Sequence, residues 1–162
     1  MKHYQTDRFY TQAAILGVVA GMRAMSAPAI AAKMLARIAF ADNAKEVPAF
    51  LQSEPVHTAL SLLAIAEFVG DKLPNTPNRT ATPGVIARCV TGALAGAAIC
   101  KANRCNAFIG ALIGSGTALA STFGCFYLRK NLVQNSCLPD PTIGAMEDAL
   151  VVSTGLALIS LV

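Results

Sequence analysis

The sequence predicts an all-α protein that crosses a membrane about five times, and three observations support this fold class. Of 162 residues, 54% are hydrophobic and only 14% are charged, whereas soluble domains average roughly 25% charged residues. Short polar stretches separate hydrophobic runs, most of them near the length of about 20 residues that a bilayer crossing needs. These runs are rich in Ala, Leu, Ile and Val and lack the alternation typical of barrel strands. We therefore expect closely packed helices in a single integral membrane domain, residues 1–162.

The first expected segment, Thr11 to Phe40, is longer than one crossing requires and contains a proline. Pro28 has no amide hydrogen and disfavours helix at the residue before it. We expect a kink there, or a break into two half-helices between Met25 and Pro28. Lys33 and Arg37 would then lie near the far interface, where long basic side chains can reach water.

Capping residues and prolines delimit the other four segments. A cap followed by proline begins the second and fifth segments, at Ser53 to Pro55 and at Asp140 to Pro141. Pro74 ends the second segment, and a turn at Lys101 to Arg104 separates the third from the fourth. The expected ranges are Pro55–Lys72, Gly84–Cys100, Cys105–Leu128 and Pro141–Val162.

Five single crossings would divide the basic residues between the two sides of the membrane. The amino-terminal side would hold Lys2, Arg8, Lys72, Arg79, Arg129 and Lys130, and the opposite side Lys33, Arg37, Lys45, Lys101 and Arg104. This small excess favours an amino terminus on the inside. A bent or re-entrant first segment would change the count.

Glycines four residues apart recur in three of the expected helices. Residues without side chains let helix backbones approach closely, which helix packing in a membrane requires because lipid provides no hydrophobic drive between helices. The same surfaces suit assembly into a homo-oligomer. The pairs are Gly17 and Gly21, Gly92 and Gly96, and Gly110 and Gly114.

Ionised side chains interrupt the hydrophobic runs and form the candidate site. An ionised group at mid-membrane costs at least roughly 2.5 kcal/mol on insertion scales, so such groups pair or face a cavity and indicate function by default. Glu67 and Asp71 share one helix face, which would suit a proton or cation relay. Asp71 and Lys72 are equally compatible with an interfacial position at the helix end.

A second acidic pair lies in the fifth segment. Glu147 and Asp148 begin about 10 Å inside that helix and point about 100° apart. We expect one of them to bond Arg23 and the other to face the basic residues after the second segment and in the third. The full set of expected solute- or ion-binding residues is Arg23, Glu67, Asp71, Lys72, Arg79, Arg88, Glu147 and Asp148. A purely structural network of ion pairs would use the same residues.

Catalytic and cofactor motifs are not found in the sequence. It has no nucleophile elbow, no Gly-rich phosphate loop, no HExxH and no Cys/His cluster, so we expect neither an enzyme nor a metal or cofactor. The net charge of +4 is spread over short connections, which favours contact with anionic lipid over nucleic acid. Of the five cysteines, only Cys100 and Cys105, which flank a polar turn, form a pair worth testing for a disulfide.

Several motifs, taken in order, give the chain a family resemblance. They are Gly21 to Arg23 with Pro28, Glu67 to Pro74, Thr76 to Thr80, Arg88 with Gly92 to Gly96, Arg129, and Glu147 to Leu150. In this order they resemble the bacterial membrane proteins catalogued as domain of unknown function 4126. The resemblance covers most of the chain and implies a small multi-pass helical protein of the bacterial inner membrane, with no activity to carry over. The chain departs from the pattern at Cys100 to Cys105 and around Gln134 to Cys137.

Two functions remain open from the sequence. If the first segment is two half-helices, Thr11–Lys72 and Gly84–Val162 each hold three helices, and an inverted repeat of the kind found in transporters is possible. We expect a homo-oligomeric transporter or channel-like protein for a small solute or ion. The alternative is a non-transporting scaffold or lipid-binding protein with a structural ion-pair network. A water-accessible cavity reaching Glu67 would favour transport, and a dry, fully paired cluster the alternative.

Overall fold

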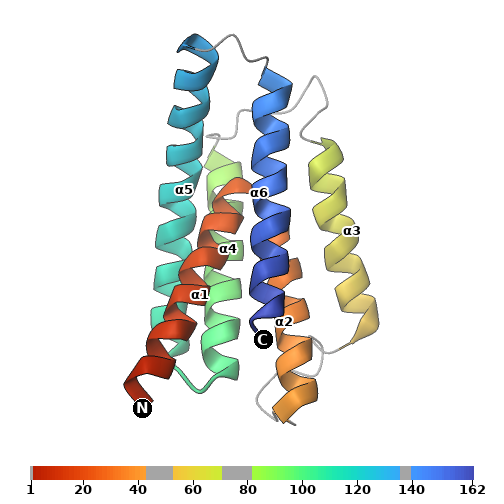
Figure 1. Cartoon of the computed structure of the whole chain (residues 1–162), viewed down its shortest axis with the longest axis vertical. Coiled ribbons are helices and arrows are strands. Elements are labelled where there is room, and N and C mark those ends of the chain that lie inside the picture. Colours follow the sequence, from red (N-terminus) through yellow and green to blue (C-terminus); the bar gives the residue numbers. More distant parts are fainter. Residues whose placement is uncertain (1, 43–52, 71–81, 136–139) are drawn as a thin grey trace.

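The structure, a computed structural model, describes residues 2–42, 53–70, 82–135 and 140–162, and the regular elements in these ranges are all α-helices (Figure 1). They are α1 (Lys2–Met22), α2 (Ser26–Asp42), α3 (Glu54–Gly70), α4 (Thr82–Ala102), α5 (Ala107–Asn135) and α6 (Asp140–Ser160). This confirms the all-α class for the described residues.

Three of these helices are long and apolar enough to cross a membrane. They cover Thr82–Ala102 in α4, Ala107–Gln134 in α5 and Thr142–Ser160 in α6. The helices α2 and α3 have 17 residues each. The chain therefore has the character of an integral membrane protein, while the count of about five crossings stays a prediction.

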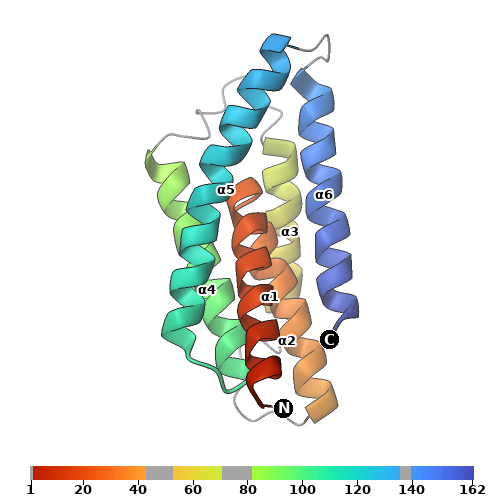
Figure 2. The same ribbon diagram turned by 60° about the vertical axis from the view of Figure 1, so that its left-hand side comes forward.

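The first two helices form a hairpin that enters the bundle and turns back inside it (Figures 1 and 2). Near the start of α1, Arg8 donates a hydrogen bond to the carbonyl oxygen of Leu161. Near the end of α2, Arg37 donates to the carbonyl oxygen of Ile159 at 2.8 Å. Both outer ends of the hairpin thus lie at the carboxyl end of α6, where both chain termini also lie (Figure 1). We call residues 23–25 the hairpin tip.

The hairpin confirms one prediction for the first segment and corrects another. The segment is divided into two helices, as expected, but the break lies at residues 23–25, ahead of the predicted position between Met25 and Pro28. Pro28 falls in the first turn of α2, where a missing amide hydrogen breaks no helix bond. The expectation that Lys33 and Arg37 lie at the far interface was wrong. It assumed that the chain continues across the membrane, whereas α2 returns to the end of the bundle from which α1 starts, so Arg8 and Arg37 share one end.

The start of α3 follows its sequence signal, whereas the end of α5 does not. The carbonyl oxygen of Ser53 accepts hydrogen bonds from the Val56 and His57 amides at the start of α3, as a cap should. The end of α5 was predicted at Leu128, but this helix continues to Asn135. The prediction was wrong because charge alone does not end a helix, and residues 129–135 contain no glycine or proline.

A tight turn joins α4 to α5. The amide of Cys105 donates to the carbonyl oxygen of Cys100 at 2.8 Å, and that of Arg104 to Lys101 at 3.1 Å, which is a Schellman ending. Arg104 takes the left-handed position at φ 57°, and the Asn106 side chain caps α5. The two cysteines of the turn are free thiols, so the disulfide considered from the sequence is not formed. Burial raises the pKa of the Cys105 thiol.

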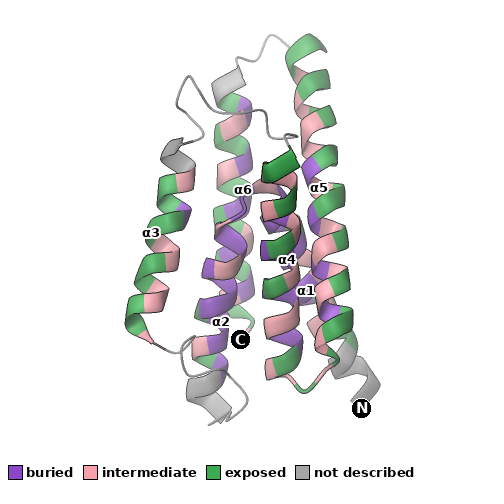
Figure 3. Ribbon diagram, turned by 180° about the vertical axis from the view of Figure 1, so that it is seen from behind, coloured by how far each residue is buried: buried purple, intermediate pink, exposed green. Residues whose placement is uncertain are grey.

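The hairpin supplies most of the buried core (Figure 3). On the outward faces of the other four helices, large apolar side chains are exposed, among them Phe108 at 70% and Leu156 at 65%. Such faces suit contact with lipid, since a soluble monomer rarely exposes apolar surface on this scale. The largest fully buried side chains are Leu16, Val19, Met34, Leu35, Ile99, Cys100 and Leu158.

Glycines lie where α1, α4 and α5 approach most closely. A Cβ atom on Gly92 would lie 2.7 Å from the carbonyl oxygen of Gly114, and one on Gly110 would lie 2.6 Å from that of Gly96. Both distances are well inside van der Waals contact, so these backbones could not approach as they do if the glycines carried side chains. These two contacts join α4 and α5, and Gly21 has the same role for α1, since a Cβ atom on it would lie 2.5 Å from the carbonyl oxygen of Ala118 on α5.

We predict that Gly114→Ala destabilises the protein, because the added methyl overlaps the carbonyl oxygen of Gly92. Overpacking of this kind typically costs about 1–3 kcal/mol. Gly116→Ala on the same helix is the matched control, since the added methyl meets no described atom within 4 Å apart from the nearby backbone of its own helix, and it should be neutral or slightly stabilising. Unfolding of the detergent-solubilised protein measures both, and equal stability of the two variants would contradict the packing described above.

Candidate functional site

The hairpin tip contains peptide groups that the helices themselves cannot bond. The amide of Arg23 donates to the carbonyl oxygen of Val19 at 2.8 Å and is the last helical bond of α1. The next two amides along the chain are those of Ala24 and Met25. They precede α2, whose first helical bond runs from the Ala29 amide to the carbonyl oxygen of Met25. In a membrane each unsatisfied peptide group costs several kcal/mol, so these two amides need acceptors from elsewhere in the fold.

Glu67 of α3 supplies both acceptors. Its Oε1 atom accepts from the amide of Ala24 at 2.8 Å, and its Oε2 atom accepts from the amide of Met25 at 2.7 Å. The start of α2 carries the partial positive charge of a helix amino terminus, which favours a carboxylate at this point. Glu67 therefore occupies the position in which an anionic ligand would bind to a half-helix.

Arg23 lies on the other side of the tip, with an exposed fraction of 2%. Its Nε atom donates to Asp148 Oδ1 at 3.0 Å, its Nη2 atom donates to the same oxygen, and Nη1 lies 3.5 Å from the carbonyl oxygen of Glu67. A cation at this place also faces the partial negative charge at the carboxyl end of α1. Asp148 is thus the acid of the α6 pair that bonds Arg23.

Two hydroxyl groups of α5 lie against carbonyl oxygens in the last two turns of α1. The Ser121 hydroxyl donates to the carbonyl oxygen of Val18 at 2.9 Å. The Thr122 hydroxyl lies 3.3 Å from the carbonyl oxygen of Gly21 and 2.8 Å from that of Ala118 in its own helix. Side chains from α3, α5 and α6 therefore converge on the tip.

Glu147, the neighbour of Asp148, faces a different partner. Its Oε2 atom lies 4.0 Å from Nη1 of Arg129 on α5. Arg129 was not in the predicted site, because the sequence reading took it as the end of its helix. The uninterrupted helix-forming run after Leu128 is the signal that would have placed it inside the helix and near α6.

The remaining predicted residues divide into one that the structure places and three that it does not. Arg88 is buried on α4, with an exposed fraction of 6%, and the Thr91 hydroxyl donates to its carbonyl oxygen. Asp71, Lys72 and Arg79 lie outside the described residues. The described contacts thus join Arg23, Glu67 and Asp148 around one point. Within the described ranges no three His, Cys, Asp or Glu side chains are grouped to hold a metal ion.

Comparison with known proteins gives one match. A family model described as "Domain of unknown function (DUF4126)" matches residues 11–161. Neither the curated proteins nor the solved structures gave a match. The motifs of the predicted site all lie within the matched range, and so do the hairpin tip and its partners.

We predict strong energetic coupling between Arg23 and Asp148. Removing one partner leaves the other charge buried without compensation, so Arg23→Met or Asp148→Leu alone should lower the free energy of unfolding by about 3–5 kcal/mol. The double variant should lose clearly less than the sum of the two. Lys130→Met, which removes an exposed basic residue of α5, is the control and should be near neutral. Additive losses in the double variant would show that the ion pair does not act as a unit.

Proposed function

The chain belongs to the DUF4126 family, and from the geometry of the hairpin tip we propose that it moves a small solute or ion across the bacterial inner membrane. The observation that carries this proposal is the Glu67 carboxylate bound by the amides of Ala24 and Met25 at a helix break inside the bundle. Because Glu67 bonds these amides through a side chain and not through the backbone, it can move away from them by a change of side-chain position. A helix end without its partner is an ion- or solute-binding site.

Two general properties of membrane proteins support transport. Non-helical backbone at membrane depth is tolerated only where it is buried in protein or lines a water-filled cavity. In many transporters such broken helices bind substrate or coupling ions with the exposed ends of half-helices. The tip of this hairpin is a helix break of that kind, and Arg23 next to it adds a positive charge. An anion of the size of a carboxylate fits the same donors as Glu67.

The proposed role of Glu67 is an alternating one. As a carboxylate it occupies the amino end of α2 and closes the site. After binding a proton or a cation it loses the charge-assisted bonds to the two amides, which frees these amides for a solute that binds beside Arg23. The helix that carries Glu67 is suited to such a movement, because α3 lies at the edge of the bundle and packs chiefly against α2 (Figure 1).

The charge pairing favours a second candidate, a non-transporting membrane scaffold. Arg23, Glu67 and Asp148 are bonded to one another or to the backbone, and Glu147 is paired with Arg129. A pocket between α2, α3 and α6 does not have Glu67 in its lining. In this candidate the cluster fixes the hairpin, and the helices serve assembly of a homo-oligomer. The inverted repeat considered from the sequence would support only the first candidate, the transporter.

Flux measurements separate the two candidates. Purified protein in proteoliposomes is screened with protons, alkali cations, halides, phosphate and small carboxylates. We expect flux of at least one of them, lowered tenfold or more by Glu67→Gln and by Arg23→Ala. Glu67→Gln cannot gain and lose the charge that the alternation needs, and Arg23→Ala removes the positive charge beside the site.

Glu54→Gln is the matched control for that screen. It makes the same change at the opposite end of α3, where the side chain is exposed, so flux should equal that of the wild type. Size-exclusion chromatography checks that each variant is folded. Flux that survives both tip substitutions would refute the proposed site, and wild-type protein that passes none of the solutes would favour the scaffold.

A further inference from the structure

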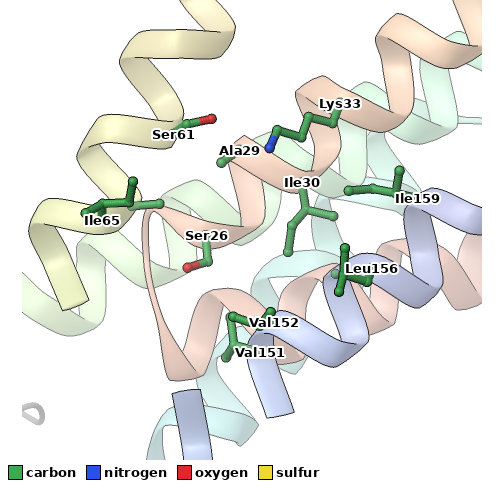
Figure 4. A pocket seen from close by; sticks show the side chains of 12 residues that line it. Ser26, Ala29, Ile30, Lys33, Ser61, Ile65, Val151, Val152, Leu156 and Ile159 are labelled. Atoms are coloured by element: carbon green, nitrogen blue, oxygen red, sulfur yellow. The ribbon is translucent and has the colours of Figure 1, made fainter. Parts of the chain in front are cut away.

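A groove of about 240 Å³ lies between α2, α3 and α6 (Figure 4). Most of its lining is aliphatic, with Ile30 from α2, Ile65 from α3, and Val151 and Leu156 from α6. None of the three residues that meet at the hairpin tip, Arg23, Glu67 and Asp148, lines it. The groove is therefore a separate feature, and its few polar groups indicate what it could bind.

Among the described residues that line the groove, Lys33 alone is charged. Its side chain is exposed, and among the described residues no carboxylate lies within ion-pair distance of its ammonium group. Figure 4 shows the ammonium group of Lys33 and the hydroxyl group of Ser61 pointing toward each other between α2 and α3. An exposed basic side chain near a membrane surface attracts anionic lipid head groups, so an anion that reaches Lys33 would be bound favourably.

The groove has a basic end and an apolar end. Because α2 and α6 both run toward the end of the bundle that holds the chain termini, Lys33 and Ile159 mark the groove's outer end (Figures 1 and 4). Arg37, one turn beyond Lys33, bonds the carbonyl oxygen of Ile159 there. From this end the aliphatic walls lead inward to Val151 and Ser26, beside the hairpin tip. A ligand with an anionic head and a long apolar chain matches this order.

We propose that the groove binds one anionic phospholipid from the leaflet next to the chain termini. Its phosphate contacts Lys33 and Ser61, and one acyl chain lies along Ile30 and Leu156 toward the hairpin tip. The acyl chain fills the space between α3 and α6 and so supports α3, the helix that carries Glu67. This site does not depend on transport, because a scaffold would bind the same lipid through the same residues.

Native mass spectrometry of the detergent-solubilised protein tests the site. The protein is incubated with phosphatidylglycerol or phosphatidylcholine of identical acyl chains, and the fraction that retains one lipid is compared. We expect preferential retention of phosphatidylglycerol by the wild type. Lys33→Gln should weaken that preference about fivefold, the contribution of one basic residue to binding of an anionic lipid. Lys101→Gln, which removes an exposed lysine of α4 at the same end of the bundle, should not change it.

Two further variants examine the apolar part of the groove. Ile65→Trp and Leu156→Trp place a large ring in it from positions that are 59% and 65% exposed, so at least one should fold and should lose retained phosphatidylglycerol. Equal retention of the two lipids by the wild type would overturn the proposal. An equal loss of phosphatidylglycerol retention in Lys33→Gln and Lys101→Gln would also overturn it. The same holds if a folded Trp variant retains as much phosphatidylglycerol as the wild type, or if the protein retains added oleate but no phosphatidylglycerol.

Discussion

A peptide chain that reverses direction inside a helix bundle must bond every peptide group at its turn, and the rest of this structure depends on that constraint. At residues 23–25 the helices provide no acceptors for the amides of Ala24 and Met25. Glu67 accepts both, Arg23 is fixed by Asp148, and hydroxyl groups of α5 contact carbonyl oxygens in the last two turns of α1. Three helices that are distant in sequence are thereby positioned around one turn of the backbone.

The electrostatics and the packing of the hairpin support each other. The carboxyl end of α1 and the amino end of α2 present opposite partial charges at the tip, and Arg23 and Glu67 have the complementary signs. Glycines at the contacts with α4 and α5 allow α1 to lie inside the bundle rather than on its surface. The charged residues thus lie in the protein interior, where their partners are protein groups and not lipid. Such an interior can carry a solute or simply hold the hairpin in place, and the two proposed functions differ in whether Glu67 ever leaves the tip.

The sequence predicted which residues form the site better than it predicted how the helices that carry them are arranged. Pro28 revealed the break, and the cost of burying charge singled out Arg23, Glu67 and Asp148. The reversal of the chain could not be predicted, because a proline removes one helix bond but the angle at the break is set by the groups that bond the freed amides, here from α3. Arg129 was overlooked because a basic pair was read as a helix end, although nothing after it interrupts the helix. Where Asp71 and Arg79 lie relative to the tip stays a prediction, since they fall outside the described residues.

The central claim is that the Glu67 carboxylate bonds the two free amides of the tip, and residue-resolved hydrogen exchange of those amides tests it most directly. In the native protein in lipid nanodiscs, the amides of Ala24 and Met25 should exchange as slowly as those in the interior of α2. In Glu67→Ala both should exchange much faster, while amides in the interior of α5 keep their native rates. Rapid exchange of Ala24 and Met25 in the native protein, or unchanged exchange in the variant, would contradict the account.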